Sequence, residues 1–198
     1  ADPADMPQIE TEVVLWGDDP HLSAWLAAQG IKARPFAPSP HAACEVILAG
    51  NQPPAGGAAG FSELARHLAR GSVAVFLAPE IFKKGDDPAG WLPLANKGKL
   101  VNLPVWVYHK DDWAKNHPIF DGLPAGCVLD HTFYREVFSS QGWTGQEPLA
   151  EAVAGAINTG CGYNSGLTVA VHPLGAGRFI LNTLRIRENL GKDPVAER

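Results

Sequence analysis

The run of residues 72–78, Ser-Val-Ala-Val-Phe-Leu-Ala, is the feature that most limits what this chain can fold into. A strand with one face in water alternates apolar and polar residues, whereas this run has no polar face after its first residue. Such a strand is typical of the centre of a parallel sheet that helices cover on both faces. The run therefore predicts an α/β fold in which residues 72–78 form a central strand.

The segments before this run alternate between strand and helix patterns. Short strands are predicted at residues 12–16, 31–36 and 45–49, and helices with apolar residues at helical spacing at 21–29 and 61–70. Asp19, as N-cap, and Pro20, at the first helical position, mark the start of the first helix. This order of elements predicts a doubly wound, mostly parallel sheet with helices on both faces.

The second half of the chain is less regular. Residues 100–108 resemble an edge or bent strand, because Pro104 interrupts them. Residues 128–138 are predicted to be extended, and residues 148–158 fit either a strand or a helix. Residues 167–172 and 178–184 read as two strands joined by Pro-Leu-Gly-Ala-Gly, which predicts a C-terminal antiparallel hairpin.

We expect residues 1–198 to form a single domain that is a piece of a longer chain, since a helix opened by Asp193 and Pro194 stops after one turn. The formal net charge is −5, and the 16 Lys and Arg residues are scattered, so no nucleic-acid surface is expected. No apolar run is long enough to predict a membrane span. The three cysteines form no CxxC pair, which argues against a zinc or redox motif.

Ligands of open parallel sheets bind at the carboxyl ends of the strands, which places three loops of interest at residues 17–19, 50–52 and 79–81. A hydrolase of this shape carries Ser or Cys on a tight turn after a central strand. Here that position reads Ala78-Pro79-Glu80, with neither nucleophile. Glu80 is a candidate acid or base together with His109 or His131, and the alternative role for it is a capping or surface carboxylate.

Five residues are candidates for ligand binding. Asp18 and Asp19 could hold a metal or sugar hydroxyls, although the helix cap already explains one of them. Trp91, Trp113 and Trp143 are expected in loops, where an aromatic face stacks on a sugar, docks another domain or covers the core. No histidine pair has metal-ligand spacing, and residues 56–60 lack the Lys-Ser/Thr ending of a P-loop, so neither metal nor cofactor is predicted.

Two segments carry a family resemblance. His117-Pro-Ile-Phe-Asp-Gly-Leu-Pro124 resembles a segment of class I glutamine amidotransferase-like domains of the carbohydrate-related branch, which includes the trimerisation domain of some β-galactosidases and the ThuA-like proteins. Gly175-Ala-Gly177-Arg178 is similar to the hairpin that closes those domains, and residues 182–194 resemble the C-terminal region of bacterial proteins related to glycoside hydrolase family 2. The resemblance covers most of the chain and implies a flavodoxin-like fold.

The chain departs from this family where active members carry their catalytic groups. Those members use a Cys on the strand-to-helix turn and a His with a Glu on a late strand, and residues 79–80 and 182–184 match neither. The resemblance thus implies a catalytically inactive accessory module of a carbohydrate-active protein, a glycoside hydrolase, that serves domain packing, oligomerisation or the shaping of a neighbouring active site.

The partners implied are other domains of the same polypeptide, a second copy of the chain, and carbohydrate. A bacterial secreted or periplasmic location would follow if the parent is a glycosidase. Two alternatives stay open. One is a stand-alone hydrolase that uses Glu80 with a histidine, and the other is a small carbohydrate-binding module.

Overall fold

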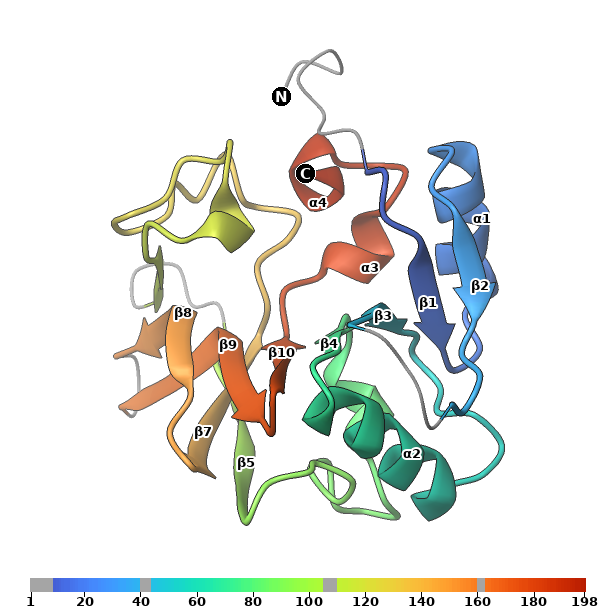
Figure 1. The fold of residues 1–198 in the computed structure, drawn as a ribbon. Helices are drawn as coiled ribbons and strands as arrows, with labels where there is room; N and C mark the ends of the chain where they lie inside the picture. Colours follow the sequence, from blue (N-terminus) through green and yellow to red (C-terminus); the bar gives the residue numbers. More distant parts are fainter. Residues whose placement is uncertain (1–8, 40–43, 105–109, 160–162) are drawn as a thin grey trace.

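The computed structural model describes residues 9–39, 44–104, 110–159 and 163–198. Ten strands within these residues form one mixed sheet in the order β2-β1-β3-β4-β10-β9-β7-β5, with β8 beside β9 and β6 beside β8 (Figure 1). The strands are β1 (Val13–Trp16), β2 (Ala33–Pro35), β3 (Val46–Ala49), β4 (Val73–Phe76), β5 (Asn96–Asn102), β6 (Lys110–Ala114), β7 (Gln141–Glu147), β8 (Glu151–Asn158), β9 (Asn164–Leu174) and β10 (Gly177–Asn182).

One half of the sheet is parallel and consists of β2, β1, β3, β4 and β10. The predicted central strand lies where expected, because β4 pairs in parallel with β3 on one side and with β10 on the other. The predicted C-terminal hairpin is also confirmed, as β9 and β10 pair antiparallel from Gly177 opposite Leu174 onward. The chain is therefore an α/β protein with a strand-rich mixed sheet.

Two helices of more than one turn accompany the parallel half. Helix α1 (Pro20–Ala28) begins where the sequence predicts, with Asp19 accepting a hydrogen bond from the Leu22 N–H at 3.1 Å. Helix α2 (Ala58–Ala69) begins three residues before the predicted start, since the two alanines that precede Gly60 continue the helix toward its N-cap, Gly57.

Alternate residues of the parallel strands enter different cores. Trp16, Ile47 and Phe76 pack with the buried residues of α2, whereas Leu15 and Leu48 pack with the buried leucines of α1. The apolar run around β4 lacks a polar side because both of its faces pack on apolar residues: Ala74 and Phe76 on the α2 side, and Leu77 on the α1 side.

The antiparallel half, β5 to β9, lacks this cover. The remaining α-helices of the described residues, α3 (Ile186–Asn189) and α4 (Pro194–Glu197), have four residues each. A sheet with helices on both faces across its width, as predicted, is therefore not confirmed. A separate core that includes Phe120, Tyr134 and Phe138 fills the space beside β6, β8 and β9 instead.

In the second half one expectation is wrong, one alternative is decided, and two strands were not predicted. The strand expected at 100–108 corresponds in part to β5, and residues 105–109 lie outside the described part of the chain. Residues 131–137 form turns rather than a strand, because the Asp130 carboxylate accepts the Phe133 N–H at 2.7 Å and bends the chain, and Val128 forms only an isolated bridge with Trp113. Residues 151–158 are strand β8, which removes the helix alternative. Strands β6 and β7 were not predicted at all, since two aspartates in one and two glycines in the other hide the strand pattern.

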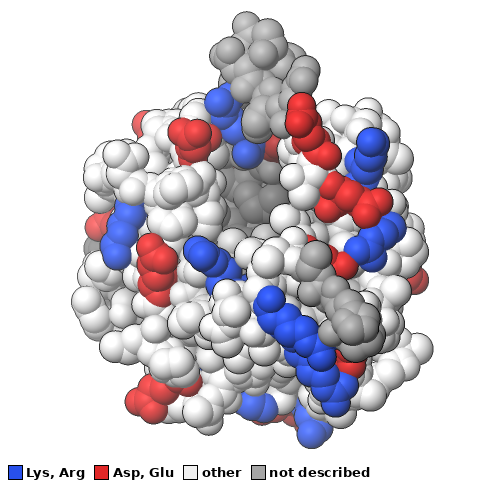
Figure 2. Space-filling model, viewed as in Figure 1, with Lys and Arg blue, Asp and Glu red and all other residues white. Residues whose placement is uncertain are grey.

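The visible face of the molecule carries positive and negative side chains intermingled (Figure 2). Within the described residues no helix has the length and apolar character needed to cross a membrane.

Candidate functional site

The loops after β1 and β3 meet at the carboxyl edge of the parallel strands. The Asp18 N–H donates to the Gln52 carbonyl at 3.2 Å, and the two residues form an antiparallel bridge. Gly17 has a φ of +92°, and a Cβ atom there would lie 2.1 Å from the Gln52 carbonyl oxygen. Only glycine permits this close crossing, so the sequence fixes the relative position of the two loops.

Asp19 is buried at this edge and fully engaged. Besides capping α1, its carboxylate binds Arg187, with Nε at 2.5 Å from Oδ2 and Nη2 at 2.9 Å from Oδ1. Burial alone would raise the pKa of Asp19, but the hydrogen bonds from Arg187 and Leu22 and the charge of Arg187 oppose it, and the pKa is lowered overall. Asp19 therefore holds the C-terminal region against α1 and has little capacity left for a ligand.

Glu80 and Asp18 are exposed. Glu80 lies in a 3-10 helix, η2 (Pro79–Phe82). The hydrogen bond to Asp19 is the main cause that raises the pKa of Arg187, and the negative charge of Glu80 makes a smaller contribution in the same direction. Within the described residues Glu80 forms no ion pair with a histidine, and His109 lies outside them. The acid–base role of Glu80 with a histidine therefore stays a prediction.

His131 belongs to the other half of the molecule. Its exposed ring lies 5.5 Å from the ring of Phe138, and its charge acts on Asp112 in β6. Burial raises the pKa of Asp112, and the charge of Lys110 opposes this shift. The neighbours of His131 belong to the core beside β6 and β8, whereas Ile81 and Phe82, next to Glu80, belong to the core under α2.

The three candidate tryptophans do not share one loop surface. Trp91 stacks on Phe61 with ring centroids 5.4 Å apart and receives the Lys84 ammonium at 4.6 Å. Trp143, predicted in a loop, is buried within β7, and Trp113 lies in β6. These two line a recess of about 470 Å³ together with the exposed Tyr163.

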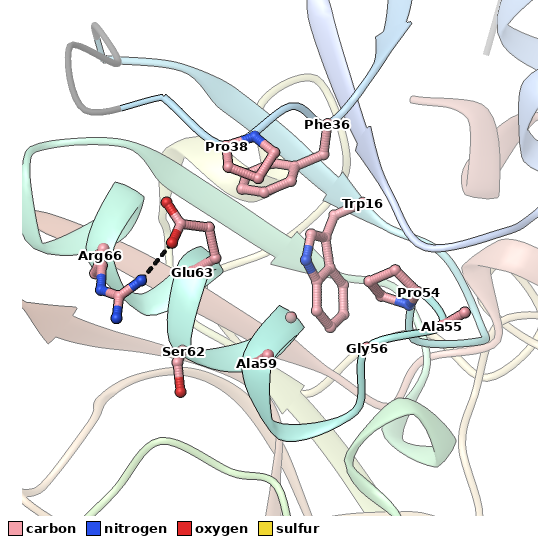
Figure 3. A pocket seen from close by; sticks show the side chains of 11 residues that line it. Trp16, Phe36, Pro38, Pro54, Ala55, Gly56, Ala59, Ser62, Glu63 and Arg66 are labelled. Carbon is pink, nitrogen blue, oxygen red and sulfur yellow. Dashed lines mark hydrogen bonds and ion pairs between the residues drawn. The ribbon is translucent and has the colours of Figure 1, made fainter.

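A larger hollow of about 610 Å³ opens at the carboxyl edge, and we call it the Trp16 pocket (Figure 3). Trp16, the last residue of β1, lies at its centre. Phe36 and Pro38, which follow β2, form one wall, and Pro54, in the loop after β3, faces them across the indole. The first two turns of α2 complete the lining.

The polar side chains of the Trp16 pocket come from α2. Glu63 and Arg66 form an ion pair, with Nη1 at 2.5 Å from Oε2, and Ser62 lies beside them. Trp16 was not among the residues predicted to bind a ligand. The signal that could have found the pocket is a tryptophan at the last position of a strand, directly before the Gly-Asp loop at the ligand-binding edge.

The buried His67 of α2 fastens the wall of this pocket. Its Nε2 accepts the Ser39 N–H at 3.2 Å, and its Nδ1 lies 2.9 Å from Glu45 Oε2. Since Nε2 accepts, the proton is on Nδ1, which donates to Glu45. Across the described residues, no three His, Cys, Asp or Glu side chains gather closely enough to hold a metal ion.

Comparison with known proteins gives structural neighbours only. No protein-family description matches the chain, and no curated protein matches it in sequence. The structure is similar to a β-galactosidase from Rahnella sp. R3 (14% identity, TM-score 0.48, 90% of this chain and 29% of that one). It is also similar to an exo-β-1,4-mannosidase from an Opitutaceae bacterium (11% identity, TM-score 0.45, 90% and 32%) and to a cytoplasmic protein from Salmonella typhimurium LT2 (11% identity, TM-score 0.49, 92% and 91%).

The chain thus spans about a third of the two glycosidases and most of the Salmonella protein. TM-scores between 0.45 and 0.49 at 11–14% identity do not establish a common function.

Proposed function

We propose that this chain is a non-catalytic accessory module of a carbohydrate-active protein, a glycoside hydrolase, and serves domain packing, oligomerisation or the shaping of a neighbouring active site. One observation carries the proposal. At the edge where a hydrolase of this architecture holds its catalytic groups, β4 is followed by Ala78-Pro79-Glu80, and the buried carboxylate of Asp19 is committed to α1 and Arg187.

Strand order supports the flavodoxin-like part of this proposal. The parallel strands lie in the order β2-β1-β3-β4-β10, so the first four strands and the last one follow the 2-1-3-4-5 order of flavodoxin-like sheets. The carbohydrate setting rests on the resemblance of residues 117–124 and 175–194 to glycosidase-associated amidotransferase-like domains.

An apolar recess supports the packing role. It measures about 520 Å³ and lies between the α1 side of the sheet and the short helices α3 and α4. Its sheet residues include Leu48, Val75, Leu77 and Ile180, all of which are only half-buried. A recess of this size with almost no polar lining is a surface that a neighbouring domain or a second copy would bury.

Hydrolysis assays test the proposal directly. We expect the purified chain to release no product above the blank from a panel of nitrophenyl glycosides and esters, and the E80Q variant to behave identically. Turnover that disappears in E80Q would establish the stand-alone hydrolase instead. The reading frame that encodes the chain should also encode a glycosidase domain, and a frame without one would contradict the accessory role.

A further inference from the structure

Trp16, which lines this pocket, carries a hydrogen-bond donor that no atom of the described residues accepts. The residue is 0% exposed, and its Nε1 has no hydrogen-bond partner among the described residues. An indole N–H can only donate, and a buried donor without an acceptor lowers stability. Phe61 and Phe76 contact the indole edge-on, at centroid distances of 4.9 and 6.4 Å. A phenylalanine would satisfy such contacts equally, so packing does not account for the N–H group.

An acceptor and a second donor lie on the α2 side of the same pocket. Figure 3 shows the nitrogen edge of the Trp16 indole turned toward the side on which Glu63 lies. Glu63 and Arg66 neutralise each other, so the lining carries no net charge. A ligand in this pocket would find a hydrogen-bond donor in Trp16 and an acceptor in Glu63, in surroundings without net charge.

The remaining walls are flat and apolar. Phe36 and Pro38 on one side and Pro54 on the other contribute ring faces with no donor groups. The pocket volume of about 610 Å³ lies within the range of small-molecule sites.

The geometry points to a neutral pyranose sugar as the ligand of the Trp16 pocket. A sugar hydroxyl is both donor and acceptor, so a single hydroxyl accepts from Trp16 Nε1 while it donates to the Glu63 carboxylate. The C–H face of the ring packs against Phe36 and Pro54. A purely apolar molecule leaves the indole N–H unpaired. A simple anion such as acetate accepts from the indole but has no hydrogen to donate to the Glu63 carboxylate. The assignment deepens the proposed function and rests on it for the source of the sugar.

Entry of the sugar requires a small movement of one wall. The indole nitrogen is covered, and the Phe36–Pro38 wall is fastened to α2 by the Ser39 N–H on His67 Nε2 and by the Phe36 ring, 4.6 Å from the His67 ring. Displacing this wall costs part of the binding energy, so we expect weak affinity, in the millimolar range.

Indole NMR signals test the assignment, since each tryptophan gives one N–H cross-peak. The 15N-labelled chain is titrated with methyl glucoside, methyl galactoside and methyl mannoside, and with glucuronate and acetate as anions. We expect at least one neutral glycoside to shift the Trp16 peak saturably. The peak is assigned by its loss in W16F, in which the aromatic ring is kept.

W16F and W143F form a matched pair, because Trp143 is also buried, has no partner for its Nε1 among the described residues, and lines the other recess. We expect W16F to weaken glycoside binding about tenfold, the loss of one hydrogen bond. Both variants exchange a buried indole for a smaller ring, so W143F controls for the loss of packing in W16F. W143F should leave glycoside binding unchanged.

Three results would overturn the assignment. Shifts confined to Trp113 and Trp143 place the sugar in the recess beside Tyr163. A Trp16 shift with the anions alone makes the pocket an anion site. The absence of any Trp16 shift removes the ligand altogether. None of these results depends on glycoside hydrolysis, so a failure of the sugar assignment can be distinguished from a failure of the proposed accessory role.

Discussion

The ion pair between Asp19 and Arg187 offers the sharpest test of what holds this fold together. Asp19 caps the first helix of the chain, while Arg187 belongs to α3, so the pair joins the two ends of the described chain. The Asp19 side chain is 3% exposed and that of Arg187 is 21% exposed. Because both are largely withdrawn from water, removal of one partner leaves the other poorly solvated.

Two substitutions at Asp19 separate the cap from the charge. Asparagine is a good N-cap, so D19N retains that hydrogen bond and loses only the ion pair, whereas D19A loses both. Breaking a buried pair costs about 3–5 kcal/mol, and the partial hydration of Arg187 favours the lower end, about 3 kcal/mol for D19N. D19A should cost about 1 kcal/mol more, the contribution of one cap.

Urea denaturation followed by circular dichroism measures these costs. With a slope of about 2–3 kcal/mol per molar urea, D19N should lower the midpoint by about 1 M. R187M and the D19N/R187M double variant complete a thermodynamic cycle, in which we expect a coupling energy above about 1 kcal/mol. A D19N variant as stable as the wild type, or a coupling energy near zero, would refute this explanation.

Acid should abolish the difference between wild type and D19N. The pKa of Asp19 in the folded chain lies below its usual value of 3.8. The carboxylate therefore contributes its full stability above that value and loses it as the pH falls through the folded pKa. Plotted against pH, the unfolding free energies of the wild type and D19N should differ at neutral pH and converge below about pH 4. Curves that stay parallel down to pH 2 would contradict the assignment of the charge to Asp19.

Three further predictions follow from single sites. Burial lowers the pKa of His172 from 6.5, and its Nδ1 has no partner among the described residues, so the stability of the wild type should decline below pH 6.5. In thermal unfolding, H172F should lose this decline and be about 1 kcal/mol more stable. G177A should lower the free energy of unfolding by about 3 kcal/mol or more, because its Cβ would lie 2.1 Å from the Ser72 carbonyl oxygen. G30A has open space around it but a φ of +70°, and should lower the free energy of unfolding by about 1 kcal/mol in the same urea assay. E80Q, at an exposed position, should change the unfolding free energy by less than about 0.5 kcal/mol, and a larger change would reveal a structural role for Glu80.

Short sequence signals made the parallel half and the C-terminal hairpin predictable from the sequence. The apolar run at β4, the Asp19-Pro20 start of α1 and the glycine-marked C-terminal hairpin each carry their signal within a few residues. Two strands of the antiparallel half could not be predicted in this way. Strands β6 and β7 contain Asp and Gly, which disfavour strands in isolation, and they form because partners distant in sequence, β8 and β5, complete their hydrogen bonds.

The candidate site was only partly predictable for a related reason. Asp19 could be recognised as a cap, but its pairing with Arg187 spans 168 positions and has no sequence signature. Trp113 and Trp143 lie on β6 and β7, and the pairing of both strands into one sheet through β8 and β9 brings them to one recess. That Trp16 Nε1 finds no acceptor in the described part of the chain is likewise a consequence of three-dimensional packing, since an acceptor would have to come from another segment.

The pairing of β10 with β4 also decides when the chain can fold during synthesis. Asn182 donates to the Leu77 carbonyl across 105 positions, and β5 to β9 lie between the two strands in sequence. Until β10 leaves the ribosome, β4 has a bare edge with unpaired backbone groups and an apolar side chain on each side of it. Contacts this distant in sequence form slowly. A nascent chain that stalls within the antiparallel half should therefore be prone to aggregation and to capture by chaperones, whereas a chain extended past residue 182 should escape both.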